Sequence, residues 1–281
     1  MPINRPNVFS AGAATNTDLF LDAAARKLGD AARVRSFYGR NPDVDASPEY
    51  LTNNGSARAF NSTGYYDRIV SSSALDTAGG TGATKVFIEG IDAEGDFAQE
   101  IVSLNGTTAV DFANDYYWIN VAEVVEYGAL GINVGTITLR EGTTGKQTIG
   151  LAEGMAVNGG IAYPRGFYPV LQDIQVSCSR DSGVATAGDM QVWLFHVQDV
   201  NNDVVQNRIM TWDFPFSSLA QGVYVQEVPF LDPFHILPTA AQGQCENGPS
   251  GGYFYFQADG DAALSCSVSV RGNMLFRDSR S

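Results

Sequence analysis

The segment Thr84-Lys85-Val86-Phe87-Ile88-Glu89-Gly90-Ile91 decides the fold class, because its side chains alternate between two faces as those of a β-strand do. The turn Asp92-Ala93-Glu94-Gly95 follows it directly. The chain then returns through Phe97–Leu104, which ends at Asn105-Gly106. Two alternating segments joined by a short turn rich in Asp and Gly predict a β-hairpin.

Strands of the same kind are predicted on both sides of this hairpin. The segment Met190–Val197 is apolar on both faces, which is typical of a central strand that is covered on both sides. A short helix is predicted in only one place, from Thr17 to Gly29. The other strand candidates are Arg68–Ser71, Tyr116–Tyr127, Val134–Arg140, Thr148–Leu151, Tyr168–Ser179, Asn207–Phe214, Val223–Val228, Gly252–Ala258 and Ala263–Phe276.

These strands predict an all-β protein with two β-sandwich domains, for which a jelly-roll topology is favoured. The Gly- and Pro-rich stretch at 155–164 indicates the boundary between them. We therefore expect an extended N-terminal arm with the short helix and a loop at 1–62, a first sandwich at 63–157 and a second at 158–281.

The net charge of −14 is unevenly distributed along the chain. Residues 1–40 carry six cations and three aspartates, so the rest of the chain has a net charge of −17. An acidic body repels phosphates, so we do not expect a nucleic-acid partner. The basic arm is expected either to dock on an acidic surface, including that of a neighbouring copy, or simply to be solvated. The predicted assembly contacts are Arg5, Phe9, Arg26, Lys27, Arg33, Arg35 and Arg40.

The sequence offers little for catalysis or metal binding. His196 lies in an apolar segment, and neither it nor His235 has a second ligand at metal-binding spacing. Gly145-Lys146 resembles the end of a phosphate-binding loop, but Arg140 occupies the position of the first glycine. The Asp-rich turns at 92–96, 199–203 and 259–261 lack the later glutamate of a calcium loop. We therefore predict no enzyme, cofactor or metal, although catalytic carboxylates that meet only in three dimensions stay open.

The cysteines and the apolar segments complete this picture. Cys178, Cys245 and Cys266 do not have the spacing of a metal site, and Cys178 and Cys266 are expected to be buried free thiols in strands. The first six residues lack the apolar core of a signal peptide. No run of eighteen apolar residues occurs, so no membrane partner is expected.

Three segments together resemble a known family: Tyr38–Asp45, Val70–Ala83 and Lys85–Thr108. They are similar to virion structural proteins common in tailed phages, particularly marine ones, with the best match over residues 38–140. The segment before residue 38 has no match. The resemblance implies a particle component without known chemistry, and it does not fix a place in the particle.

We therefore expect a virion protein, assembled in the host cytoplasm, that decorates or cements a phage head through its N-terminal arm. Partners would be capsid or other virion proteins and copies of itself, with a trimer favoured. Deletion of residues 1–37 should abolish incorporation and leave the body folded. The alternatives are a tail, neck or fibre component, possibly a glycan-binding receptor module whose tryptophans stack on sugars, and a double jelly-roll major capsid protein.

Overall fold

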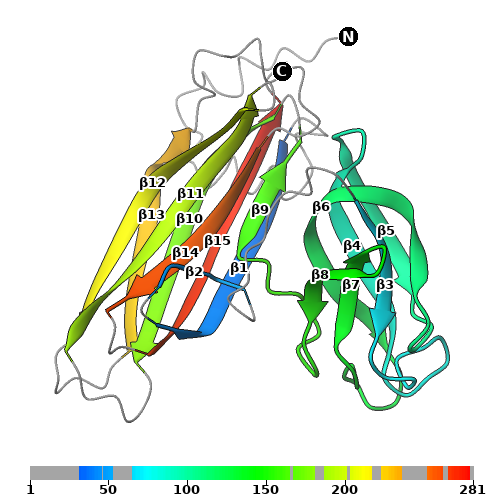
Figure 1. Ribbon diagram of the computed structural model, residues 1–281. Coiled ribbons are helices and arrows are strands. Elements are labelled where there is room, and N and C mark those ends of the chain that lie inside the picture. The colour runs from blue at the N-terminus through cyan, green and yellow to red at the C-terminus, as the bar shows by residue number, and fades with distance from the viewer. Residues whose placement is uncertain are drawn as a thin grey trace, which may run out of the picture.

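The computed structural model describes residues 32–45, 47–52, 65–164, 167–180, 187–200, 203–216, 223–235, 252–261 and 265–278 (Figure 1). In these residues the chain forms fifteen strands in three antiparallel sheets, which confirms the all-β prediction. The predicted helix from Thr17 to Gly29 lies outside the described residues. Within the described part, no helix is long and apolar enough to cross a membrane.

Two sheets face each other and form a sandwich (Figure 1). The first sheet has the order β1-β15-β10-β13, and the second has the order β12-β11-β14-β2, with β9 also paired to β14. The strands of the first sheet are β1 (Ala32–Val44), β15 (Cys266–Asp278), β10 (Phe167–Arg180) and β13 (Val223–His235). Those of the second are β12 (Asp203–Phe216), β11 (Gly188–Val200), β14 (Gly252–Gly260), β2 (Glu49–Tyr50) and β9 (Gly160–Tyr163).

The core of the sandwich fills the space between these two sheets. Strand β11 lies between β12 and β14, so the apolar segment Met190–Val197 is a central strand as predicted. Phe37 of the first sheet stacks on Phe256 of the second, with ring centroids 5.4 Å apart. Cys178 and Cys266 are buried free thiols in this core, as expected.

The third sheet has the order β5-β4-β6-β3-β7-β8 and encloses a separate core. The hairpin read from the sequence is present, since β4 pairs with β5 from Lys85 to Ile91. Instead of the predicted sandwich of two sheets, this unit is a single sheet that bends at its longest strand, β6. Its strands are β3 (Tyr66–Ser71), β4 (Ala83–Asp92), β5 (Phe97–Ser103), β6 (Val110–Tyr127), β7 (Ile137–Glu141) and β8 (Thr144–Ile149).

The bend arises because β6 changes partner along its length. Its first part, up to Tyr116, pairs with β3, and the rest pairs with β4 with several shifts of register. A strand that changes partners in this way forms the corner of a folded sheet. Gly90 permits the closest approach there, because a Cβ at this position would lie 2.1 Å from the carbonyl oxygen of Trp118.

The third sheet is an insertion into the sandwich. Along β14, Gln257 and Ala258 pair with β2, and residues 252–255 pair with β9. Strands β2 and β9 therefore lie end to end on one edge of β14, and residues 52–158 leave and re-enter the sandwich between them. The two ends of the insertion meet, since the backbone of Gly159 lies against the carbonyl oxygen of Leu51.

The predicted domain boundaries are therefore wrong at one place. Residues 32–51 are not part of an arm but supply β1 and β2 to the sandwich. The sequence concealed this because β1 contains three arginines, an Asn and a Pro, and its partner β15 is the last described strand of the chain. A deletion of residues 1–37 would remove almost half of β1, so it cannot separate arm from body.

Candidate functional site

The predicted assembly residues fall into different settings. Arg5, Phe9, Arg26 and Lys27 lie outside the described residues. Arg33 lies opposite Phe276 in the backbone pairing of β1 with β15, and its side chain is also outside the described part. Arg40 is exposed on β1 and is thus the one member of the set with a described surface position.

Arg35 is engaged inside the chain. Its Nη2 donates a hydrogen bond of 2.6 Å to one carboxylate oxygen of Glu89 on β4, and its Nε donates to the other oxygen. The guanidinium also lies 5.8 Å from the ring centroid of Phe97, which adds a cation–π contact. Only 7% of the Glu89 side chain is exposed. Arg35 therefore joins the sandwich to the third sheet, whereas the sequence had suggested a contact between molecules.

An apolar cluster accompanies this ion pair at the junction of the two units. Ile91, Trp118 and Ala162 are fully buried there, and the rings of Trp118 and Tyr253 lie 5.1 Å apart. The amide side chain of Asn120 continues the sheet pattern, since it both donates to the carbonyl of Ala162 and accepts from its N–H, each at 2.8 Å. Side chains from strands of both units thus pack together at this junction.

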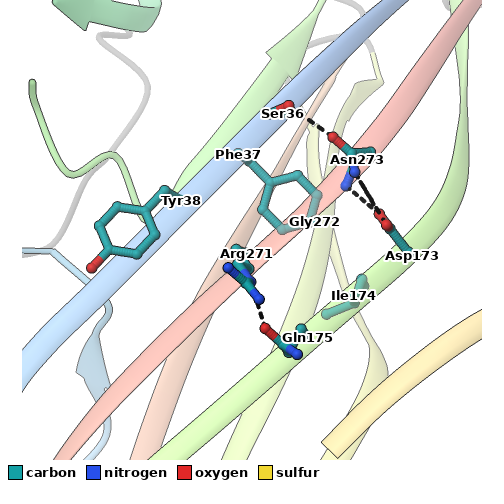
Figure 2. Close-up of a pocket in the computed structure, with 9 residues that line it drawn as sticks. All are labelled: Ser36, Phe37, Tyr38, Asp173, Ile174, Gln175, Arg271, Gly272 and Asn273. Carbon is teal, nitrogen blue, oxygen red and sulfur yellow. Dashed lines mark hydrogen bonds between the residues drawn. The ribbon is translucent and has the colours of Figure 1, made fainter.

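The depression on the outer face of the first sheet is the candidate binding site (Figure 2). Its volume is about 470 Å³, and residues of β1, β10 and β15 form it. Beneath the depression, on the core side of the sheet, Phe37 packs against the backbone of Gly272, where a Cβ would lie 2.5 Å from the Phe37 ring. The residues that line it are Ser36, Phe37, Tyr38, Asp173, Ile174, Gln175, Arg271, Gly272 and Asn273.

The polar side chains of the depression are connected by hydrogen bonds (Figure 2). Ser36 Oγ donates to Asn273 Oδ1 at 2.7 Å, and Asn273 Nδ2 donates to both carboxylate oxygens of Asp173, at 3.0 and 3.1 Å. The backbone N–H of Asn273 donates to Asp173 as well, at 2.7 Å. Arg271 Nε donates to Gln175 Oε1. This network crosses all three strands and fixes the side chains in place.

The described side chains of the depression are suited to contacts with polar groups. Ser36 is hydrogen-bonded to an amide oxygen and not to a base, so its hydroxyl is not activated as a nucleophile. Asp173, Asn273 and Arg271 present planar polar groups, which bind hydroxyl and amide groups of a ligand well. Tyr38 adds a partly exposed aromatic ring at one end. Such a surface is suited to a polar ligand or to a partner protein.

Other residues considered for chemistry have structural positions. His196 is buried, its Nε2 lies 2.8 Å from the hydroxyl of Tyr163, and burial lowers its pKa to about 4. It is therefore the neutral core histidine expected from the sequence. The side chain of His235 lies outside the described part.

The acidic turn at 92–96 is organised by its own backbone, because Asp92 accepts a hydrogen bond from the backbone N–H of Asp96 at 2.8 Å. Among the described residues, no three His, Cys, Asp or Glu side chains are placed to hold a metal ion.

Sequence reasoning missed the depression. A signal for it exists in β15, where Ser267, Ser269, Arg271 and Asn273 alternate with buried residues. This period of two predicts a polar outer face. It does not predict which strands flank β15, and β1 and β10 supply the other half of the network.

Comparison with known proteins does not identify the chain. No protein-family model matches it, and no curated protein does either. Among solved structures, one similarity is to "Structure of infectious bursal disease virus Gt strain", with 10% sequence identity over 88% of this chain and 81% of that one. Its TM-score is 0.12, which is too low to establish a common fold.

Proposed function

We propose that the chain is a virion structural protein, a repeated subunit that decorates or cements a phage head through its N-terminal residues. The strand order of the sandwich is the observation that carries this proposal. We renumber the sandwich strands 1 to 8 in chain order and count β2 and β9 together as the interrupted strand 2. The order β1-β15-β10-β13 then becomes 1-8-3-6, and the order β12-β11-β14-β2 becomes 5-4-7-2. This order supports a jelly-roll topology, an architecture used in viral capsid and lectin domains.

The insertion fits the same role. A third sheet joined through a part-buried ion pair and an apolar cluster gives a body of two connected parts, which suits a subunit that bridges neighbours. Its strand order, β5-β4-β6-β3-β7-β8, does not repeat the jelly-roll order. A decoration protein therefore fits the architecture better than a double jelly-roll capsid protein.

Incorporation of a truncated chain into particles tests this role. Deletion of residues 1–31 stops just before β1, so both parts of the body keep all their strands. We expect the full-length chain to be present in purified particles at a fixed copy number and to rebind stripped heads in a sedimentation assay. The truncated chain should have an unchanged thermal midpoint and fail to rebind.

Two results would contradict the proposal. Absence of the chain from purified particles would remove the virion role altogether. Rebinding of the truncated chain at normal occupancy would retain the virion role but exclude attachment through the N-terminal residues. A map of the assembled particle would then show which surface of the body makes the contact.

A glycan-binding role is the second candidate, because the depression combines planar polar side chains with the aromatic ring of Tyr38. Aromatic rings stack on the apolar faces of sugars, while Asp, Asn and Arg hydrogen-bond their hydroxyls. A glycan array with the wild-type chain and with Tyr38→Ala and Arg271→Ala variants tests it. Binding that both variants lose would support the receptor role, and an array without binding would remove it.

A further inference from the structure

One end of the third sheet exposes an unusual number of large apolar side chains. We name this end the apolar tip; it consists of the loops 72–82, 128–135 and 150–155 together with the end of β6. Exposed fractions range from 37% for Tyr127 to 63% for Leu151. Together these side chains expose on the order of 500 Å², near the upper end of what a monomeric protein shows in one patch. The exposed apolar residues of the tip are Leu75, Val125, Tyr127, Leu130, Ile132, Leu151 and Met155.

Backbone contacts bring these loops together. The N–H of Leu130 donates to the carbonyl of Thr81 at 2.9 Å, and the N–H of Gly82 donates to the carbonyl of Leu75 at 3.0 Å. The N–H of Ala152 donates to the carbonyl of Asn133 at 3.1 Å. The three loops therefore form a single surface.

Two buried polar residues hold the tip rigid. Asp76 is fully buried, and its carboxylate accepts hydrogen bonds from the Ser71 hydroxyl and from the backbone N–H groups of Ala83, Val134 and Gly135, at 2.6 to 2.9 Å. Asn133 is also fully buried and donates to the carbonyls of Gly135 and Gly150. A carboxylate with four donors fixes the loops around it, so their apolar side chains are held in place before any partner arrives.

Two of the three loops of the tip, 72–82 and 128–135, expose no charged side chain. The end of β6 exposes Glu123 and Glu126, and Glu126 is paired with Lys85 at 2.8 Å. No charged residue occurs from Gly128 to Leu139. The one acid of the first loop, Asp76, is buried. Glu153 of the third loop is exposed, and its carboxylate accepts a hydrogen bond from the N–H of Gly150 at 3.1 Å. Copies with a net charge of −14 repel one another over most of their surface. The two uncharged loops of the tip are where two copies can approach with the least repulsion.

We propose that the apolar tip is a contact between two copies of this chain. A cationic partner would gain more from the acidic surfaces elsewhere, whereas an uncharged apolar surface is complementary to another like it. The exposed apolar area of the tip, on the order of 500 Å², is more than half of the roughly 800 Å² per partner that a standard interface buries. This inference deepens the proposed function, on which it rests, because it names the surface through which the repeated subunits associate.

The position of the tip suits such a contact. Strand β4 runs from the tip, where it begins at Ala83, to the junction with the sandwich near Ile91 (Figure 1). Ten residues of extended strand span about 33 Å. The part of the tip next to Ala83 therefore lies one strand length from the junction, whereas the third loop, 150–155, is followed after a few residues by β9 of the sandwich.

Sedimentation velocity of the purified full-length chain over a range of concentrations tests the proposal. We expect the wild type to associate with rising concentration. The double variant Leu130→Asp/Leu151→Asp should weaken association at least about tenfold in dissociation constant, because it buries charge in the contact. A second double variant on the same surface, Ile132→Asp/Leu75→Asp, should weaken association to a similar extent. Agreement between the two variants would show that the loss does not come from a local folding defect in one of them.

A matched control is available on the edge strand β13. Val223 and Val225 are 69% and 54% exposed, so Val223→Asp/Val225→Asp adds the same charge to equally exposed positions away from the tip. This control should associate as the wild type does. A wild type that stays monomeric, tip variants that associate normally, or a control that is weakened as much as the tip variants would each overturn the proposal. The assay uses no particles, so its outcome is separate from that of the incorporation test.

Discussion

The sandwich and the third sheet differ most in how far apart in sequence their paired strands lie. In the sandwich, Ala32 of the first strand pairs with Arg277 of the last. In the third sheet, all six strands come from one continuous stretch, from Tyr66 to Ile149. Loop closure over long separations slows folding, so the third sheet should form first and the sandwich only when its last strand is complete.

The comparison also separates two kinds of buried polar group. The third sheet is organised around a charged side chain, Asp76, whose donors come from the sheet's own loops. The sandwich buries a neutral one, His196, among aromatic rings of its core. A buried charge with several donors and a buried neutral base respond to different perturbations, so each unit can be disturbed without the other.

Removal of β1 should produce the largest effect. Deletion of residues 1–44 takes away the edge strand that pairs with β15 and the Phe37 ring of the core. We expect the sandwich to lose its native structure completely, while the third sheet keeps its own. Hydrogen exchange resolved by segment should show fast exchange in β10–β15 and protected amides in β4 and β6.

The deletion of residues 1–31 is the control for this experiment, since it leaves β1 whole. Its exchange pattern in the described strands should equal that of the full-length chain. Loss of protection in the third sheet of the larger deletion would show instead that the two units fold as one.

Asp76→Ala should have the next largest effect, confined to the third sheet. The change leaves one hydroxyl and three backbone N–H groups without their acceptor, and breaking such a buried charged network costs about 4 kcal/mol. Exchange-derived opening free energies should fall in β3, β4 and β7 and stay constant in the sandwich. Asp111→Asn, at a side chain that is 76% exposed on the same sheet, should change none of them.

The sequence allowed the strands to be predicted better than their arrangement. The hairpin at Lys85–Ile91 and the central strand at Met190–Val197 follow from local alternation, and both are confirmed. Strand β1 was missed because its stability depends on β15 and not on its own residues. The depression was missed for the same reason, since Ser36, Asp173 and Asn273 come from three strands that only the tertiary fold makes adjacent.

The sandwich should be the more sensitive unit to mild acid. Burial lowers the pKa of His196 to about 4 from an ordinary value of 6.5, so the folded state holds this histidine neutral. In the unfolded chain it takes up a proton below pH 6.5, so stability is complete above that pH and falls as the pH drops toward 4. The total loss is about 3 kcal/mol. Chemical denaturation monitored by exchange in β11 and β14, from pH 7 to pH 4, measures it.

The variant His196→Gln isolates this contribution from the titration of carboxylates. Glutamine can still hydrogen-bond the Tyr163 hydroxyl but does not titrate. The variant is expected to be less stable than the wild type at pH 7, and the difference between the two should narrow toward pH 4. A constant difference over this range would mean that His196 does not carry the acid sensitivity of the sandwich.

Arg35→Ala should have the smallest effect, and it acts on the junction between the two units. The loss leaves the Glu89 carboxylate, 7% exposed, without its cation. Because 22% of the Arg35 side chain is exposed, we expect about 2 kcal/mol, between the cost of breaking a surface pair and that of breaking a fully buried one. The double variant Arg35→Met/Glu89→Leu removes both charges and should recover part of this loss, since no buried charge is left unpaired.

Hydrogen exchange shows whether the ion pair couples the two units. If it does, exchange in the single variant will rise on both sides of the junction, in β1 and in β4. The rise should be much smaller in the double variant. A rise in β4 alone would instead mean that the ion pair stabilises the third sheet and that the apolar cluster around Trp118 is sufficient to hold the two units together.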